Sequence, residues 1–133
     1  MDPATSPHAA ALWVGLHIFL LLTLSALVVR QRRRHHVELG DGGVPELERA
    51  IRAFGNAAEY APAGLIALVV LAAVGAHPTT IHIAGLLLFA GRVVHAVGLS
   101  NSSGASLPRA MGMIATWLAY VFAGVALVFY AIV

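Results

Sequence analysis

Residues 48–76 read ERAIRAFGNAAEYAPAGLIALVVLAAVGA, and this segment runs from a polar helix face directly into an apolar span. Four polar side chains recur at steps of four, four and three residues: Glu48, Arg52, Asn56 and Glu59. At about 100° per residue they fall within an arc of roughly 80° and form a stripe about 16 Å long. Ionisable groups that face lipid are energetically costly, so we expect this stripe to face a protein-lined or water-filled cavity and to form a binding site.

The composition is that of an integral membrane protein. Of the 133 residues, 59% are hydrophobic and 11% are charged, whereas about 25% of a soluble domain is charged. The chain contains no cysteine, so it has no disulfide and no thiol nucleophile of its own. All eight strongly basic residues are arginines, which suits bidentate binding of anions. Because no basic patch is interleaved with exposed aromatic residues, we do not expect nucleic acid as a partner.

We expect an all-α fold, an integral membrane four-helix bundle that forms a single domain over residues 1–133. The predicted spans cover about residues 9–30, 46–76, 79–99 and 108–132. The uncharged part of the second span, Ala61–Ala76, would be about 24 Å long, short of the roughly 30 Å hydrocarbon layer. The second span must therefore include the preceding turns, which places Asn56 and Glu59 within the membrane boundary.

Four spans place every arginine of the chain at one membrane face: Arg30, Arg32, Arg33, Arg34, Arg49, Arg52, Arg92 and Arg109. By the positive-inside rule this face is cytoplasmic and both termini lie on the other side, which is the periplasm in a bacterial inner membrane. Trp13 and Tyr130 are then expected at the outer interface as aromatic anchors. Gly85, Gly91 and Gly98 are expected to allow close packing of the third span against its neighbours.

The same topology gathers polar residues from all four spans in the cytoplasmic half, namely Arg30, Arg52, Asn56, Glu59, Tyr60, Arg92, His95 and Arg109. Arg109 follows Pro108, a residue favoured at the first helical position, so its guanidinium lies beside an electropositive helix N-terminus. A cavity of this kind would attract a polyanionic ligand that also carries an ammonium group. The alternative is that Arg52 pairs with Glu48 or Glu59 and only stabilises the bundle or an oligomer. No metal site is expected, because the nearby histidines His77 and His82 lack a third ligand.

The run from Glu48 to Pro62 resembles the signature of the MAPEG family, the membrane-associated proteins of eicosanoid and glutathione metabolism. The similarity covers nearly the whole chain and includes Arg92 followed by His95 and Gly98. It implies a homotrimer with glutathione, the co-substrate, bound in each cleft between neighbouring subunits and open to the cytoplasm. Leu99 and Ala110 replace a tyrosine and a serine of some eukaryotic members, which favours a bacterial-type member over one specific for eicosanoids.

The resemblance also implies roles for particular residues. Arg109 matches the catalytic arginine that holds and activates the glutathione sulfur. Seven further positions match glutathione contacts: Arg30, Arg52, Asn56, Glu59, Tyr60, Arg92 and His95. The expected function is that of a glutathione-dependent transferase or peroxidase, acting on lipophilic electrophiles or lipid hydroperoxides that arrive through the membrane lipid. The alternative is a non-catalytic trimeric membrane subunit or a lipid-binding scaffold.

Overall fold

The computed structural model describes residues 5–132, which form four α-helices joined by short connections. The helices are α1 (Thr5–His35), α2 (Pro45–Ala73), α3 (Pro78–Asn101) and α4 (Leu107–Ile132). Each is long and apolar enough to cross a membrane, and α3, the shortest with 24 residues, is about 36 Å long. The predicted all-α architecture, with four helices that are able to span a membrane, is thereby confirmed.

The ends of the helices follow from local sequence. α2 and α3 both begin with a proline, which suits the first helical turn because the amide hydrogens there have no partner within the helix. α2 ends just before Gly75, whose φ of +76° is a left-handed conformation typical of a helix C-terminus. Between these ends α2 is continuous through Pro62, so the polar stripe and the apolar run belong to one helix, as predicted.

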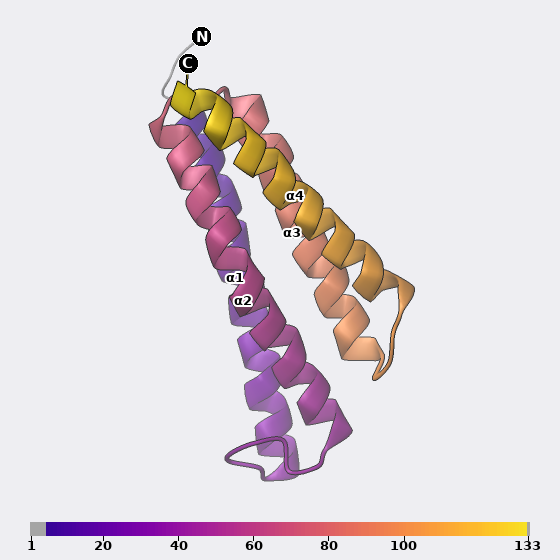
Figure 1. Ribbon diagram of the computed structural model, residues 1–133. Helices are drawn as coiled ribbons and strands as arrows, with labels where there is room; N and C mark the ends of the chain where they lie inside the picture. Colours follow the sequence, from indigo (N-terminus) through magenta and orange to yellow (C-terminus); the bar gives the residue numbers. More distant parts are fainter. Residues whose placement is uncertain (1–4, 133) are drawn as a thin grey trace.

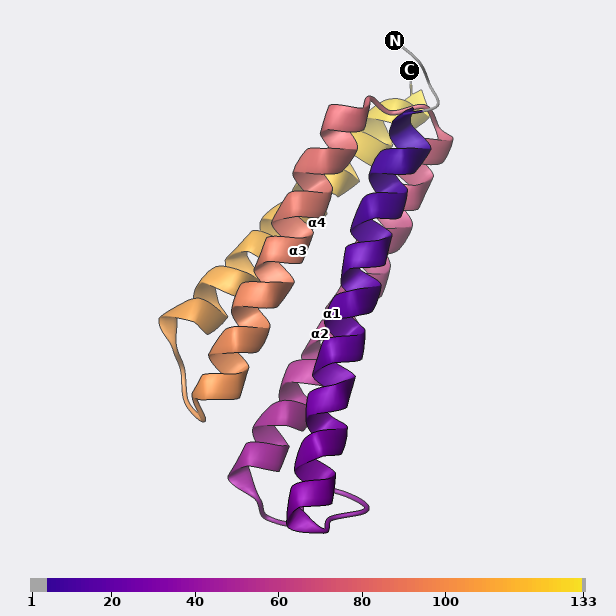
Figure 2. The ribbon, with the colours of Figure 1, turned by 180° about the vertical axis from the view of Figure 1, so that it is seen from behind.

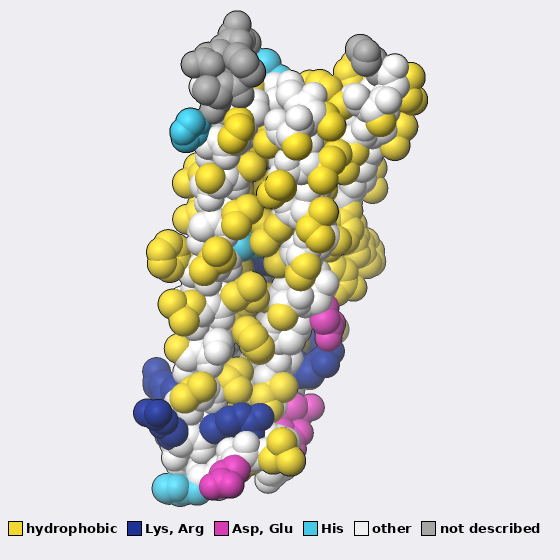
Figure 3. Space-filling view, turned by 90° about the vertical axis from the view of Figure 1, so that its left-hand side faces the viewer, with side chains coloured by type: hydrophobic (Ala, Val, Ile, Leu, Met, Phe, Trp, Pro, Cys, Tyr) yellow, Lys and Arg dark blue, Asp and Glu magenta, His cyan; other side chains and the backbone are white. Residues whose placement is uncertain are grey.

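The helices form two antiparallel pairs, α1 with α2 and α3 with α4 (Figure 1). Both pairs lie close together at the end where α1 begins and α4 ends, and they diverge toward the opposite end (Figure 2). α1 and α2 extend beyond the connection between α3 and α4 (Figure 1). Charged side chains gather at this diverging end, while apolar side chains cover most of the rest of the face shown in Figure 3.

Trp13 lies in the core at the end of the bundle where α1 begins and α4 ends. The expectation that it anchors the chain at the membrane interface is therefore wrong. Its side chain is only 8% exposed, and its Nε1 donates a hydrogen bond to His82 Nδ1 over 3.2 Å. The reason is Gly85 on α3, because a Cβ there would collide with the indole ring. The missing side chain leaves a space that the ring of Trp13 fills.

α3 and α4 touch backbone to backbone along a row of glycines, which we call the glycine seam: Gly91, Gly98 and Gly112. A Cβ on Gly91 would lie 2.9 Å from the carbonyl oxygen of Gly112, and one on Gly98 would lie 2.7 Å from the amide nitrogen of Arg109. These distances are shorter than any relaxed contact. Close packing by the glycines of α3 is therefore confirmed, and it holds Arg109 near the end of α3.

Candidate functional site

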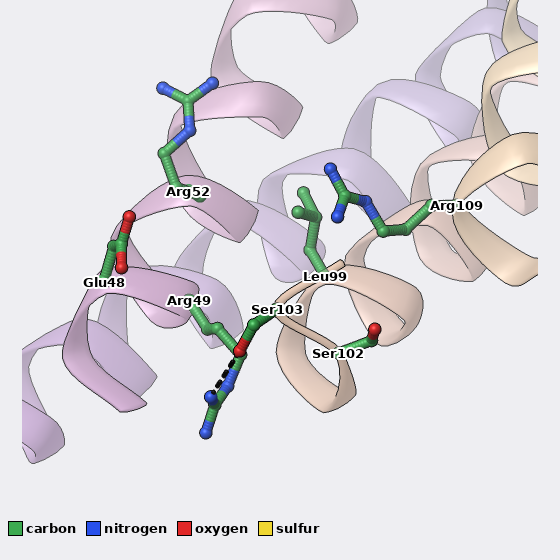
Figure 4. A pocket seen from close by; sticks show the side chains of 7 residues that line it. All are labelled: Glu48, Arg49, Arg52, Leu99, Ser102, Ser103 and Arg109. Atoms are coloured by element: carbon green, nitrogen blue, oxygen red, sulfur yellow. Dashed lines mark hydrogen bonds between the residues drawn. The ribbon is translucent and has the colours of Figure 1, made fainter. Parts of the chain in front are cut away.

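A cavity of about 210 Å³ opens at the diverging end, between the start of α2 and the connection from α3 to α4 (Figure 4). It is lined by Glu48, Arg49, Arg52, Leu99, Ser102, Ser103 and Arg109. Arg52 comes from α2 and Arg109 from the first turn of α4, 57 positions later in the chain. The structure therefore brings two of the predicted site residues to the same cavity, beside the N-terminus of α4.

Two arginine contacts hold the 102–106 connection that forms one wall of this cavity. Arg49 Nη1 donates to Ser103 Oγ over 3.1 Å (Figure 4). The Nη2 atom of Arg49 lies 3.5 Å from a carboxylate oxygen of Glu46. Arg109 donates through Nη1 to the carbonyl oxygen of Gly104. The cavity is thus closed on one side by hydrogen bonds that a ligand would have to leave in place or exchange for its own.

The charges of the polar stripe do not neutralise one another. Within residues 5–132, Arg52 forms no ion pair with either Glu48 or Glu59. Figure 4 shows the guanidinium of Arg52 extending away from Glu48. The alternative that these residues are present only to pair with one another inside a single subunit is therefore not supported by the described chain.

Arg92 lies deeper than the cavity, about 14 Å before the end of α3, and is only 1% exposed. Its Nη1 donates to Asn56 Oδ1 over 2.6 Å and its Nε to Thr116 Oγ1 over 2.9 Å. The guanidinium carbon lies 5.0 Å from the centre of the Tyr60 ring, a cation–π distance. Arg92 therefore connects α3 to two predicted site residues on α2 and to the middle of α4.

His95 contacts the first turn of α4 through a backbone carbonyl group. It is 6% exposed, and its Nδ1 donates to the carbonyl oxygen of Arg109 over 2.9 Å. Because the carbonyl can only accept, Nδ1 must carry the proton. His95 thus fixes the helical turn from which the Arg109 side chain extends.

Arg30 and Glu59 are not brought to the cavity of their own chain. Arg30 is exposed on α1, where it lines a separate groove together with Arg33 and apolar side chains. Glu59 is exposed on α2 and does not line the cavity. Both residues lie on the outer surface of the single chain, away from the cavity.

Comparison with known proteins identifies the family of this chain. The profile described as MAPEG family matches residues 10–129, which is most of the chain. The chain belongs to the MAPEG family. A protein of Escherichia coli strain K12 called inner membrane protein YecN is 40% identical over 110 residues, covering 83% of this chain and 82% of the relative. The protein of the same name from Escherichia coli O6:H1 matches to the same extent.

Among the residues of this MAPEG chain that touch the predicted site and that sequence reasoning missed are Thr116 and Tyr120. Thr116 is completely buried and accepts from Arg92, while the hydroxyl of Tyr120 donates to the carbonyl oxygen of Tyr60. The signal was their spacing from Arg109 by seven and eleven residues, which places all three near one face of α4. Thr116 and Tyr120 are also polar positions in the apolar middle part of α4, where a polar group normally has a partner.

Proposed function

We propose that this MAPEG protein is a glutathione-dependent transferase or peroxidase that acts on lipophilic electrophiles or lipid hydroperoxides. The observation that supports it is the meeting of Arg52 and Arg109, from two helices, at one cavity beside the α4 N-terminus. Glutathione offers two carboxylates to such arginines, an ammonium group to a stripe glutamate, and a thiol. The chain has no cysteine, so the reactive sulfur has to arrive with the co-substrate.

In this proposal Arg109 is the catalytic residue because it stabilises the thiolate form of bound glutathione. A free thiol with a pKa of about 8.5 is only a few per cent ionised at pH 7. A guanidinium and a helix N-terminus that lowered this pKa by about two units would contribute about 2.7 kcal/mol. The thiolate then attacks an electrophilic carbon and displaces an anion. With a hydroperoxide the thiolate attacks the terminal oxygen and breaks the O–O bond, which gives a sulfenic acid and an alkoxide that takes a proton to become an alcohol. A second glutathione thiol then attacks the sulfenic sulfur, which forms the disulfide and releases water.

We further propose a homotrimer in which each glutathione lies between neighbouring chains. The exposure of Glu59 and Arg30 supports this trimer, because each side chain lies on the surface of a helix that is long enough to span a membrane. A charged side chain that faces lipid is unfavourable, by up to roughly 2.5–3.5 kcal/mol at the bilayer centre, so a second copy packed against them would remove this cost. The cleft between copies would also add Arg30, Asn56, Glu59, Tyr60, Arg92 and His95 to the glutathione site, directly or through their neighbours.

The proposed location is a bacterial inner membrane, as the name of the Escherichia coli relative states for that protein. Every arginine of the chain lies in the half of the helices that points toward the diverging end. The positive-inside rule then favours a site open to the cytoplasm and both termini in the periplasm. Lipophilic substrates would reach the cavity from the surrounding lipid.

A non-catalytic trimeric membrane subunit, or a lipid-binding scaffold, is the second candidate. It is favoured by the Arg92 network, whose hydrogen bonds are made entirely with groups of the protein. In that case Arg52→Ala would break the oligomer in detergent, and added glutathione would leave the melting temperature of the protein unchanged. A rise in melting temperature with glutathione would exclude this candidate.

The deciding experiment measures the ultraviolet absorbance of the thiolate when purified protein is mixed with glutathione. We expect a thiolate signal in the unmodified protein and its loss in Arg109→Ala, followed by the loss of conjugating and peroxidase activity. Arg34→Ala is the control, since Arg34 is exposed in the last turn of α1 and lines none of the cavity. Equal thiolate in Arg109→Ala, or no glutathione binding at all, would refute the enzymatic proposal.

A further inference from the structure

The side-chain amide of Asn56 has one possible orientation. Its neighbour is Arg92 Nη1 at 2.6 Å, and a guanidinium can only donate hydrogen bonds. The Asn56 atom at that position must therefore be the oxygen, since the opposite orientation would place two donors against each other. The amide nitrogen, with both of its hydrogens, then lies on the side away from Arg92.

Arg92 cannot turn to serve another group, because its guanidinium is held on several sides. The Thr116 hydroxyl donates its own proton to the Gly112 carbonyl over 2.8 Å, which leaves its oxygen to accept from Arg92 Nε. Nη2 lies 3.4 Å from the same carbonyl and 3.3 Å from Met113 Sδ. With this side chain buried to 99% and fastened to α4, the direction of the Asn56 amide is built into the fold.

Asn56 follows Arg52 by one helical turn on the polar stripe and is half-buried, so its outer side remains within reach of a ligand. We propose that Arg92 is a positioning residue that makes Asn56 a hydrogen-bond donor toward the ligand. The ligand atom opposite Asn56 is then an acceptor, a carboxylate, thiolate or peptide carbonyl of glutathione, and not its ammonium group. This inference rests on the proposed function, and it leaves the ammonium to a glutamate of the stripe.

The test compares Asn56→Asp with Asn56→Ala by glutathione affinity and by melting temperature without ligand. The aspartate keeps an acceptor for Arg92, so the protein without ligand stays folded and at least as stable. It has lost the donor and places a negative charge before the ligand's acceptor, so we expect Kd to rise roughly tenfold to a hundredfold, more than in Asn56→Ala. Asn56→Asp binding glutathione as tightly as the unmodified protein would overturn this assignment alone.

The positioning role of Arg92 is tested in a double-mutant cycle. Arg92→Lys should weaken glutathione binding when Asn56 is present and cause no further loss in the Asn56→Ala background, because its effect passes through the amide. Equal losses in both backgrounds would show that Arg92 acts independently of Asn56 and would overturn the assignment. No binding of glutathione by the unmodified protein would overturn both this assignment and the proposed function.

Discussion

Gly112→Ala is the sharpest test of the contact between α3 and α4. A Cβ at this position would lie 2.5 Å from the amide nitrogen of His95, 2.6 Å from its Cβ and 2.7 Å from the carbonyl oxygen of Gly91. Non-bonded atoms are at rest at roughly 3.5–4.0 Å, so the two helices must separate by about 1 Å. Two of the three opposing atoms belong to the backbone and cannot rotate away. Overpacking of this kind lowers the free energy of unfolding by about 1–3 kcal/mol.

The assay is thermal or denaturant unfolding of the protein in detergent, with Gly124→Ala as the matched control. Gly124 lies on the same helix, and a Cβ added there would meet nothing within 4 Å. Alanine there should leave stability unchanged or raise it by up to about 1 kcal/mol through helix propensity. If Gly112→Ala were as stable as Gly124→Ala, the backbone contact in the glycine seam would be refuted.

Two further substitutions test the polar contacts of α4 in the same unfolding assay. Thr116→Val removes the buried acceptor of Arg92 Nε and should lower the free energy of unfolding by about 1.5–3 kcal/mol. Thr116→Ser keeps the hydroxyl and should lower the free energy of unfolding less. Equal losses of stability in the two variants would contradict the hydrogen bond. Tyr120→Phe removes the donor to the Tyr60 carbonyl and should lower the free energy of unfolding by about 1 kcal/mol, and an unchanged midpoint would argue against this link between α2 and α4.

The fold could be predicted because membrane helices leave strong local signals. Apolar runs bounded by prolines, glycines and arginines indicated four helices, and the short apolar part of α2 indicated that the polar stripe belongs to the same span. The glycines of α3 indicated close packing, which the seam confirms. Trp13 was misplaced because its burial depends on Gly85, a residue 72 positions away, and no local pattern reveals such a pair.

The candidate site could be predicted only in part. Arg52 and Arg109 line the same cavity as the topology required, since both lie in the N-terminal part of a helix that begins at the same end of the bundle. Which hydrogen bonds Arg92 makes depends on side-chain positions across three helices, so Thr116 and Tyr120 remained unrecognised. Arg30 and Glu59 are exposed on the single chain, and in the proposed trimer their position relative to a ligand would depend on a neighbouring copy, which the sequence of one chain does not reveal.

The glycine seam also determines which movements are open to this protein. Where two backbones touch without side chains between them, one helix cannot slide along the other without a steric clash. α3 and α4 therefore behave as one rigid arm, with Arg109 mounted at its tip. A swing of this arm against α1 and α2 that widened the cavity would pull on the 2.6 Å hydrogen bond from the buried Arg92 to Asn56, which joins the two helix pairs.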